Sequence, residues 1–168
     1  MIKHILLDWG GTIGRAGARR YFVATGRGLL PEAKRALRQL HMRADLGIVS
    51  NTSVSRRAMA QGLRKAQLSR LFPVQVYSSD AGLCSKPCRP ILERAWRRLK
   101  RRDPSLRKSQ VLFVGNDYFQ DILPAWEFGF QTALVRNGPV DLVYYLALLG
   151  GVQDLAVGSI AELPQKLF

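Results

Sequence analysis

Four polar side chains, three of them charged, follow short apolar segments of the chain. Two are carboxylates, one is a hydroxyl and one is an ammonium group: Asp8, Asp117, Ser50 and Lys86. Carboxylate oxygens suit a divalent cation such as Mg²⁺, and hydroxyl and ammonium groups can hold an anion such as phosphate. A carboxylate attacks phosphate poorly because both are negative, and a bound cation would offset that repulsion. Brought together, these groups could carry out phosphoryl transfer.

The segments around these residues alternate between short apolar strands and helical patterns. We expect strands at residues 2–7, 46–49, 74–77, 111–114, 132–135 and 155–157, and helices at 31–40, 56–67, 90–102, 121–128 and 160–167. Residues 140–149 are ambiguous, with a helix favoured. This alternation predicts a single α/β domain over residues 1–168, a three-layer α/β/α Rossmann-like fold with a mostly parallel central sheet.

In folds of this kind, ligands bind beyond the carboxyl ends of the strands. All four polar residues lie at such an end or in the loop that follows one. The pattern therefore predicts that they converge at one edge of the sheet, although more than a hundred residues separate the first from the last.

Four motifs resemble those of the haloacid dehalogenase (HAD) superfamily, and they occur in the same order. They are ILLDWGGT, IVSNT, SKPCRPIL and VLFVGNDYFQDILPAWEFGF, and the likeness extends over nearly the whole chain. The resemblance implies a HAD-like fold and a Mg²⁺-dependent phosphatase. Such an enzyme would hydrolyse a phosphomonoester through an aspartyl-phosphate on Asp8.

The resemblance also implies a role for each residue of the site. Asp8 would be the nucleophile, with Ser50 and Lys86 assisting catalysis. Ser50, Asn51, Lys86 and Gly11 would bind the phosphate, and Asp8, the Gly10 carbonyl, Asp117, Asn116 and Asp121 would surround the metal. Asp117 is the expected direct ligand, and Asp121 is expected behind it. An alternative role for these residues is helix capping. The helix after the fourth motif could be capped by Asp117 or Asp121, and the helix after the second motif by Ser50 or Asn51.

The chain departs from the family pattern in two motifs and in its lack of a large cap. Gly10 replaces the acid that normally protonates the leaving group, a transfer typically worth about 10²–10⁴-fold in rate. In the fourth motif Asn116 follows the glycine directly, and the acid is displaced to Asp117. No insertion is long enough for a cap domain, so at most residues 14–30 form a flap. The alternative is a weak or inactive HAD-fold protein that serves as a binding or regulatory module.

Composition adds a basic surface and few further sites. The formal net charge is +14, with the positive residues spread along the chain, which favours a solvated surface over an RNA or DNA site. Cys84 and Cys88 are expected to be free thiols, because a zinc site needs more ligands than they provide. No apolar segment is long enough to cross a membrane or to act as a signal peptide, so a cytoplasmic location is expected.

Overall fold

The computed structural model describes residues 1–136 and 152–168, and within them six parallel strands form one sheet. The strands are β1 (His4–Leu7), β2 (Asp45–Ser50), β3 (Val74–Tyr77), β4 (Val111–Gly115), β5 (Gln131–Val135) and β6 (Leu155–Val157), and their spatial order is β3-β2-β1-β4-β5-β6. All pairings are parallel, with β1 between β2 and β4. The predicted α/β fold and its parallel sheet are confirmed.

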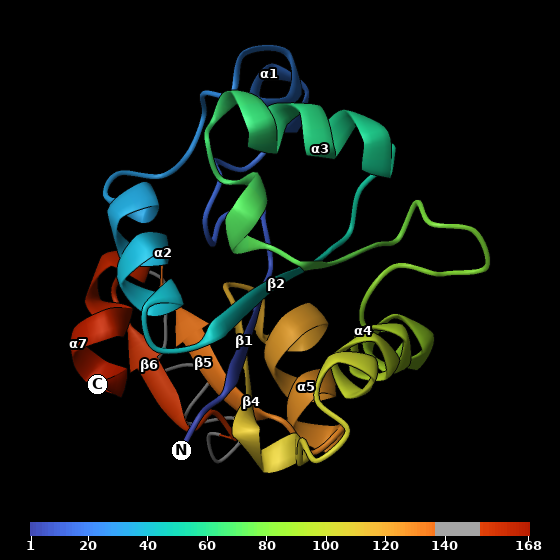
Figure 1. Ribbon diagram of the computed structural model, residues 1–168, viewed down its shortest axis with the longest axis vertical. Helices are drawn as coiled ribbons and strands as arrows, with labels where there is room; N and C mark the ends of the chain where they lie inside the picture. The colour runs from blue at the N-terminus through green and yellow to red at the C-terminus, as the bar shows by residue number, and fades with distance from the viewer. Residues whose placement is uncertain (137–151) are drawn as a thin grey trace.

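Helices cover both faces of the sheet (Figure 1). One face packs against α2 (Ala33–His41), α3 (Arg56–Lys65) and α7 (Leu163–Leu167), and the other against α4 (Arg89–Arg102) and α5 (Leu123–Glu127). Strand residues alternate between these two cores: Leu7 faces the first core and Leu6 the second. The strands read as continuously apolar because both of their faces are buried. None of the described helices has the length and apolar character needed to span a bilayer.

The segment 14–30, expected to be a loose flap, contains the helix α1 (Arg19–Thr25). Gly26 ends this helix in the left-handed conformation, with φ of 73°, and its amide donates to the Phe22 carbonyl. The Phe22 ring is fully buried 4.2 Å from the Trp9 ring, centroid to centroid. Gly62 of α3 lets the helices approach closely, since a Cβ there would lie 2.5 Å from the Phe22 ring. Packing against Trp9 and α3 therefore stabilises a helix in segment 14–30, whose glycines suggested an irregular loop.

Of two further predicted helices, one begins at a different residue and the other cannot be compared. The helix expected from residue 121 begins earlier, as the π-helical turn η3 (Tyr118–Ile122), which runs directly into α5. Asp117 is its N-cap, so the start signal lies four residues before the predicted start. The helix favoured at residues 140–149 lies outside the described residues.

Candidate active site

The carboxyl ends of β1, β2 and β4, with the loop after β3, bring the predicted polar residues to one edge of the sheet. Asp8 follows β1, and its carboxylate accepts a hydrogen bond of 2.7 Å from the Lys86 ammonium. The same ammonium is paired with the Asp121 carboxylate. All three side chains are almost completely buried. Lys86 therefore holds together two carboxylates that would otherwise repel each other.

Burial and charge act on this trio in opposite directions. Burial alone would lower the pKa of Lys86, but the charges of Asp8 and Asp121 and the hydrogen bonds to them outweigh it and raise that pKa. Burial raises the pKa of Asp121 to about 6, and the negative charge of Asp8 adds to this rise while Lys86 opposes it. Two carboxylates buried side by side contribute little to the stability of a fold, and such pairs are typical of functional sites.

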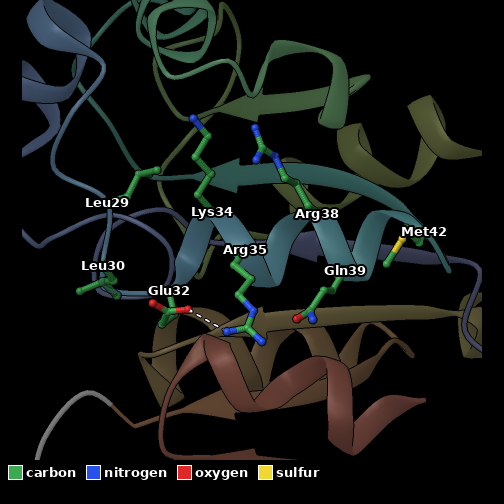
Figure 2. Close-up of a pocket in the computed structure, with 8 residues that line it drawn as sticks. All are labelled: Leu29, Leu30, Glu32, Lys34, Arg35, Arg38, Gln39 and Met42. Atoms are coloured by element: carbon green, nitrogen blue, oxygen red, sulfur yellow. Dashed lines mark ion pairs between the residues drawn. The ribbon is translucent and has the colours of Figure 1, made fainter.

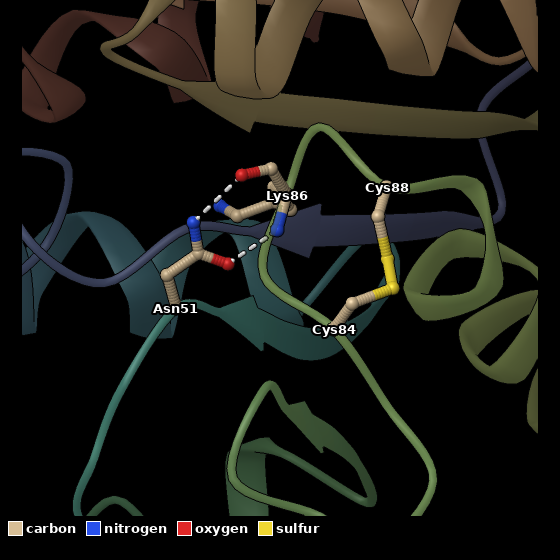
Figure 3. Close-up of a disulfide and its surroundings, with 4 residues drawn as sticks. All are labelled: Asn51, Cys84, Lys86 and Cys88. Carbon is tan, nitrogen blue, oxygen red and sulfur yellow. Dashed lines mark hydrogen bonds between the residues drawn. A yellow bond between two sulfur atoms is a disulfide. The ribbon is translucent and has the colours of Figure 1, made fainter.

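Two devices fix the main chain of Lys86 (Figure 3). The Asn51 side chain accepts from the Lys86 amide at 2.6 Å and donates to the Lys86 carbonyl at 3.1 Å. Cys84 and Cys88 form a disulfide with a Cα–Cα distance of 6.1 Å, which closes the loop on both sides of the lysine. The expectation of two free thiols is therefore wrong: the β3–α4 loop brings the two cysteines within bonding range. Asn51, predicted to bind phosphate, is engaged with this loop.

The fourth motif contributes one buried and one capping carboxylate. Asp117 Oδ1 accepts from the amides of Phe119 and Gln120 at 2.9 Å, and its Oδ2 accepts from the Gln120 side chain at 3.0 Å. Asp121 instead pairs with the Lys86 ammonium through one oxygen and accepts from the Asp117 amide at 3.1 Å through the other. The capping alternative thus describes Asp117, and Asp121 lies nearer the nucleophile than expected. Which of the two contacts a metal stays a prediction.

The tight turn after β1 requires its glycine. Gly11 has a φ of 82°, and a Cβ there would lie 2.7 Å from the Asn116 amide nitrogen. Its own amide donates to the Gly14 carbonyl at 2.7 Å. The Asn116 amide oxygen accepts from the Thr12 hydroxyl at 3.2 Å. The first and fourth motifs are therefore packed directly against each other.

Ser50 ends β2 fully buried, and its hydroxyl accepts from Arg19 Nη2 at 2.9 Å. Neither Arg19 nor Gln120 was expected in the site. Gln120 bridges two motifs, since its side-chain oxygen accepts from Asn51 at 2.9 Å. Arg19 comes from α1 and is one of four arginines in the segment 14–30, a basic cluster that could have pointed to an anion-binding role.

A cavity of about 180 Å³ opens among these residues. It is lined by Asp8, Gly10, Arg19, Asn51, Lys86, Asn116, Asp117, Gln120 and Asp121. Ser50 and Gly11 do not line it. Seven of the nine residues predicted for chemistry from the motifs thus line one small polar cavity. One of them, Asn51, also supports the loop that carries Lys86.

The donors around the cavity are of the kind that Mg²⁺ prefers. Three carboxylates and the Asn116 amide provide hard oxygen ligands. Burial, with a smaller contribution from the charge of Asp8, raises the pKa of Asp121, and a bound cation would stabilise its charged form. Within the described ranges, however, no three acidic, histidine or cysteine side chains already enclose a metal position. The Lys86 ammonium lies between Asp8 and Asp121 instead. The residue types fit Mg²⁺, and the chemistry of the donor set supports the expected metal.

A larger cavity of about 490 Å³ lies elsewhere, against α2 (Figure 2). It is lined by Leu29, Leu30, Glu32, Lys34, Arg35, Arg38, Gln39 and Met42. Its one acid, Glu32, is 3.6 Å from the Arg35 guanidinium in an exposed ion pair. None of the residues predicted for chemistry lines it, so size alone does not identify the reactive site.

The fold resembles solved HAD structures along its whole length. A magnesium-bound HAD-hydrolase structure, YfnB of Bacillus subtilis, has a TM-score of 0.74 at 15% identity, covering 99% of this chain and 98% of that one. A HAD phosphatase of Thermococcus onnurineus has a TM-score of 0.73 at 17% identity with the same coverage. A 2-haloacid dehalogenase of Pseudomonas syringae has a TM-score of 0.71 at 15% identity, also covering 99% and 98%. Identities this low establish the fold alone.

A search of curated proteins finds no match. The family model of the haloacid dehalogenase-like hydrolases, in contrast, matches residues 10–129, which is most of the chain and includes the second and third motifs in full and all but the last residue of the fourth. With the parallel sheet and the convergent motifs, this match shows that the chain belongs to the haloacid dehalogenase-like hydrolases.

Proposed function

We propose that the chain is a Mg²⁺-dependent phosphatase that transfers a phosphoryl group from its substrate to Asp8. The observation that carries this proposal is the buried Asp8 carboxylate, which faces a 180 Å³ polar cavity beside Lys86 and Asp121. A carboxylate in this position can attack a phosphorus atom, and water can then hydrolyse the aspartyl-phosphate.

The residues of the cavity divide the work between them. Asp8, the Gly10 carbonyl and a carboxylate of the fourth motif would hold Mg²⁺, which would offset the repulsion between nucleophile and phosphate. Lys86 lies 2.7 Å from Asp8 and is close enough to stabilise the charge of a phosphoryl group attached there. Asn51 and the disulfide keep this lysine in position through its main chain.

The test is phosphate release from p-nitrophenyl phosphate by the wild type, Asp8→Asn and Asp45→Asn. Asp45 is a matched control because it lies at the start of β2, the opposite end of the sheet from the cavity. We expect Asp8→Asn to abolish release and Asp45→Asn to retain it, and EDTA to remove the activity of both active proteins. Release that persists in Asp8→Asn would exclude the mechanism.

The main rival is a binding module without turnover, which the missing acid at Gly10 favours. Beryllium fluoride, a phosphate mimic, would then bind with Mg²⁺ in a calorimeter while no substrate is turned over. A second rival follows from the dehalogenases among the similar structures, since a halide also leaves without a proton. Chloride release from 2-chloropropionate in the absence of phosphate release would replace the phosphatase with a dehalogenase.

A further inference from the structure

The guanidinium of Arg19 lies beside Gly10. A Cβ built on Gly10 would lie 3.5 Å from Arg19 Nη2, so the guanidinium would be in van der Waals contact with a side chain at residue 10. Arg19 reaches this place from α1 and is anchored by its hydrogen bond to Ser50. Residue 10 carries no proton donor, and a cation lies beside it.

Arg19 has an unused donor. Among the described residues, its Nε is buried and has no hydrogen-bond partner. A buried donor left unpaired costs about 1–3 kcal/mol, and an anion would satisfy it. Burial lowers the pKa of Arg19 while the charge of Asp8 opposes that change. Arginine remains protonated at any physiological pH, so it can stabilise an anion but cannot give it a proton.

A second cavity, of about 220 Å³, adjoins the first and shares Gly10 and Arg19 with it. Arg15 and Arg20 also line it, and both are exposed to solvent. No acidic side chain of the described chain lines this cavity. It therefore offers a cationic, water-accessible compartment directly beside the place where a leaving group would depart.

We propose that the substrate is an organic diphosphate, whose terminal phosphoryl group passes to Asp8 while a phosphate monoester leaves into this arginine-lined cavity. The inference rests on the proposed phosphatase function. An Asp8 oxygen forms a bond to the terminal phosphorus, and the bond from that phosphorus to the bridging oxygen breaks. The electron pair stays on the bridging oxygen, which departs as part of an anion and needs no proton.

Water then attacks the phosphorus of the aspartyl-phosphate, and the bond to the Asp8 oxygen breaks. The carboxylate is restored and inorganic phosphate leaves, retaining the proton lost by the water. An alcohol would be a far poorer leaving group here, because it would depart as a basic alkoxide. The absent proton transfer is typically worth about 10²–10⁴-fold in rate, so the site selects acidic leaving groups.

The inference has two parts, a preference for acidic leaving groups and a site for a second phosphate. Three substrates test them separately: methyl diphosphate, acetyl phosphate and phenyl phosphate. The first two have acidic leaving groups, and only methyl diphosphate adds a second phosphate. We expect kcat/KM for phenyl phosphate to be at least about 100-fold below the other two, and KM to be lowest for methyl diphosphate. Comparable values for phenyl phosphate would overturn the role of leaving-group acidity, and a KM for methyl diphosphate no lower than for acetyl phosphate would overturn the second phosphate site.

Variants assign these effects to residues. Arg15→Gln combined with Arg20→Gln should raise KM for methyl diphosphate by about 10- to 100-fold and leave KM for acetyl phosphate unchanged, as expected for lost charge-assisted hydrogen bonds. Arg27→Gln is the matched control, since Arg27 is an exposed arginine of the same segment that does not line either cavity. Equal KM changes for both substrates would contradict the proposal.

Arg19→Gln tests the stabilisation of the leaving group itself. Its loss should reduce kcat/KM more for methyl diphosphate, whose leaving phosphate enters the cavity that Arg19 lines, than for acetyl phosphate. A merely structural role would lower all three by one common factor, and that result would overturn the assignment. Gly10→Asp should reduce the difference in kcat/KM between phenyl phosphate and the other two substrates, because it restores a possible proton donor.

The outcomes also distinguish this inference from the proposed function. Turnover of phenyl phosphate as fast as the other two, still lost in Asp8→Asn, would leave the phosphatase standing and remove the diphosphate specificity. No Asp8-dependent phosphate release from any of the three substrates would remove both. The Arg15 and Arg20 variants keep the test decisive if Arg19→Gln fails to fold, because both side chains are exposed.

Discussion

Replacing Lys86 by methionine tests whether this lysine holds the site together. The substitution keeps most of the side-chain volume but removes the charge between Asp8 and Asp121. Both carboxylates then remain buried without their shared partner. Removing one member of a buried ion pair typically costs about 3–5 kcal/mol, and here two carboxylates lose the same cation. We therefore expect the upper part of that range.

The loss should depend on pH in a defined direction. Burial already raises the pKa of Asp121 to about 6, against the opposing charge of Lys86, so removing the lysine raises that pKa further. A carboxyl with a raised pKa binds its proton more tightly in the folded state than in the unfolded state. Its protonation thus supports the fold at low pH, and this support is lost as the pH rises through the folded-state pKa. The deficit of Lys86→Met should grow from about pH 5 to about pH 8.

The assay is urea unfolding followed by circular dichroism in the presence of EDTA at several pH values. Lys166→Met is the matched control, since Lys166 is exposed on α7, and its change should stay within about 0.5 kcal/mol. Adding Asp121→Asn to Lys86→Met should recover part of the loss, because one unpaired carboxylate remains instead of two. A loss below about 1 kcal/mol at every pH would refute the view that the lysine stabilises this pair.

Two other changes test elements that support the site. The double variant Cys84→Ser/Cys88→Ser should lower the free energy of unfolding by about 2 kcal/mol, the chain entropy of so short a closed loop, and a reducing agent should reproduce this loss only in the wild type. An unchanged stability of both proteins would mean that no disulfide forms in solution. Gly62→Ala should destabilise the protein by about 1–3 kcal/mol in urea unfolding, because its Cβ would lie 2.5 Å from the buried Phe22 ring. Helix propensity favours alanine, so a net gain in stability would show that α1 moves away freely; Gln61→Ala, on the exposed side of the same helix, should stay within about 0.5 kcal/mol.

The sequence carries the fold class and the edge of the sheet at which chemistry is expected. Alternating apolar strands and amphipathic helices are local patterns, and their order implies a parallel sheet with helices on both faces. In a parallel sheet all carboxyl ends share one edge, so Asp8, Lys86 and Asp117 could be placed together before any contact was known. The family resemblance rests on the same residues, and the family match confirms it.

Only the tertiary structure decides how these residues contact one another. The ion pairs of Lys86 join residues 78 and 35 positions apart, and no local pattern determines which of Asp117 and Asp121 pairs with that lysine. The disulfide and the approach of Arg19 to Gly10 likewise depend on loop paths and on the packing of α1 against α3. Local periodicity determines which elements form, because it reflects the geometry of a single helix or strand. The contacts between their ends depend on long-range packing and electrostatics, which exist only once the chain has folded.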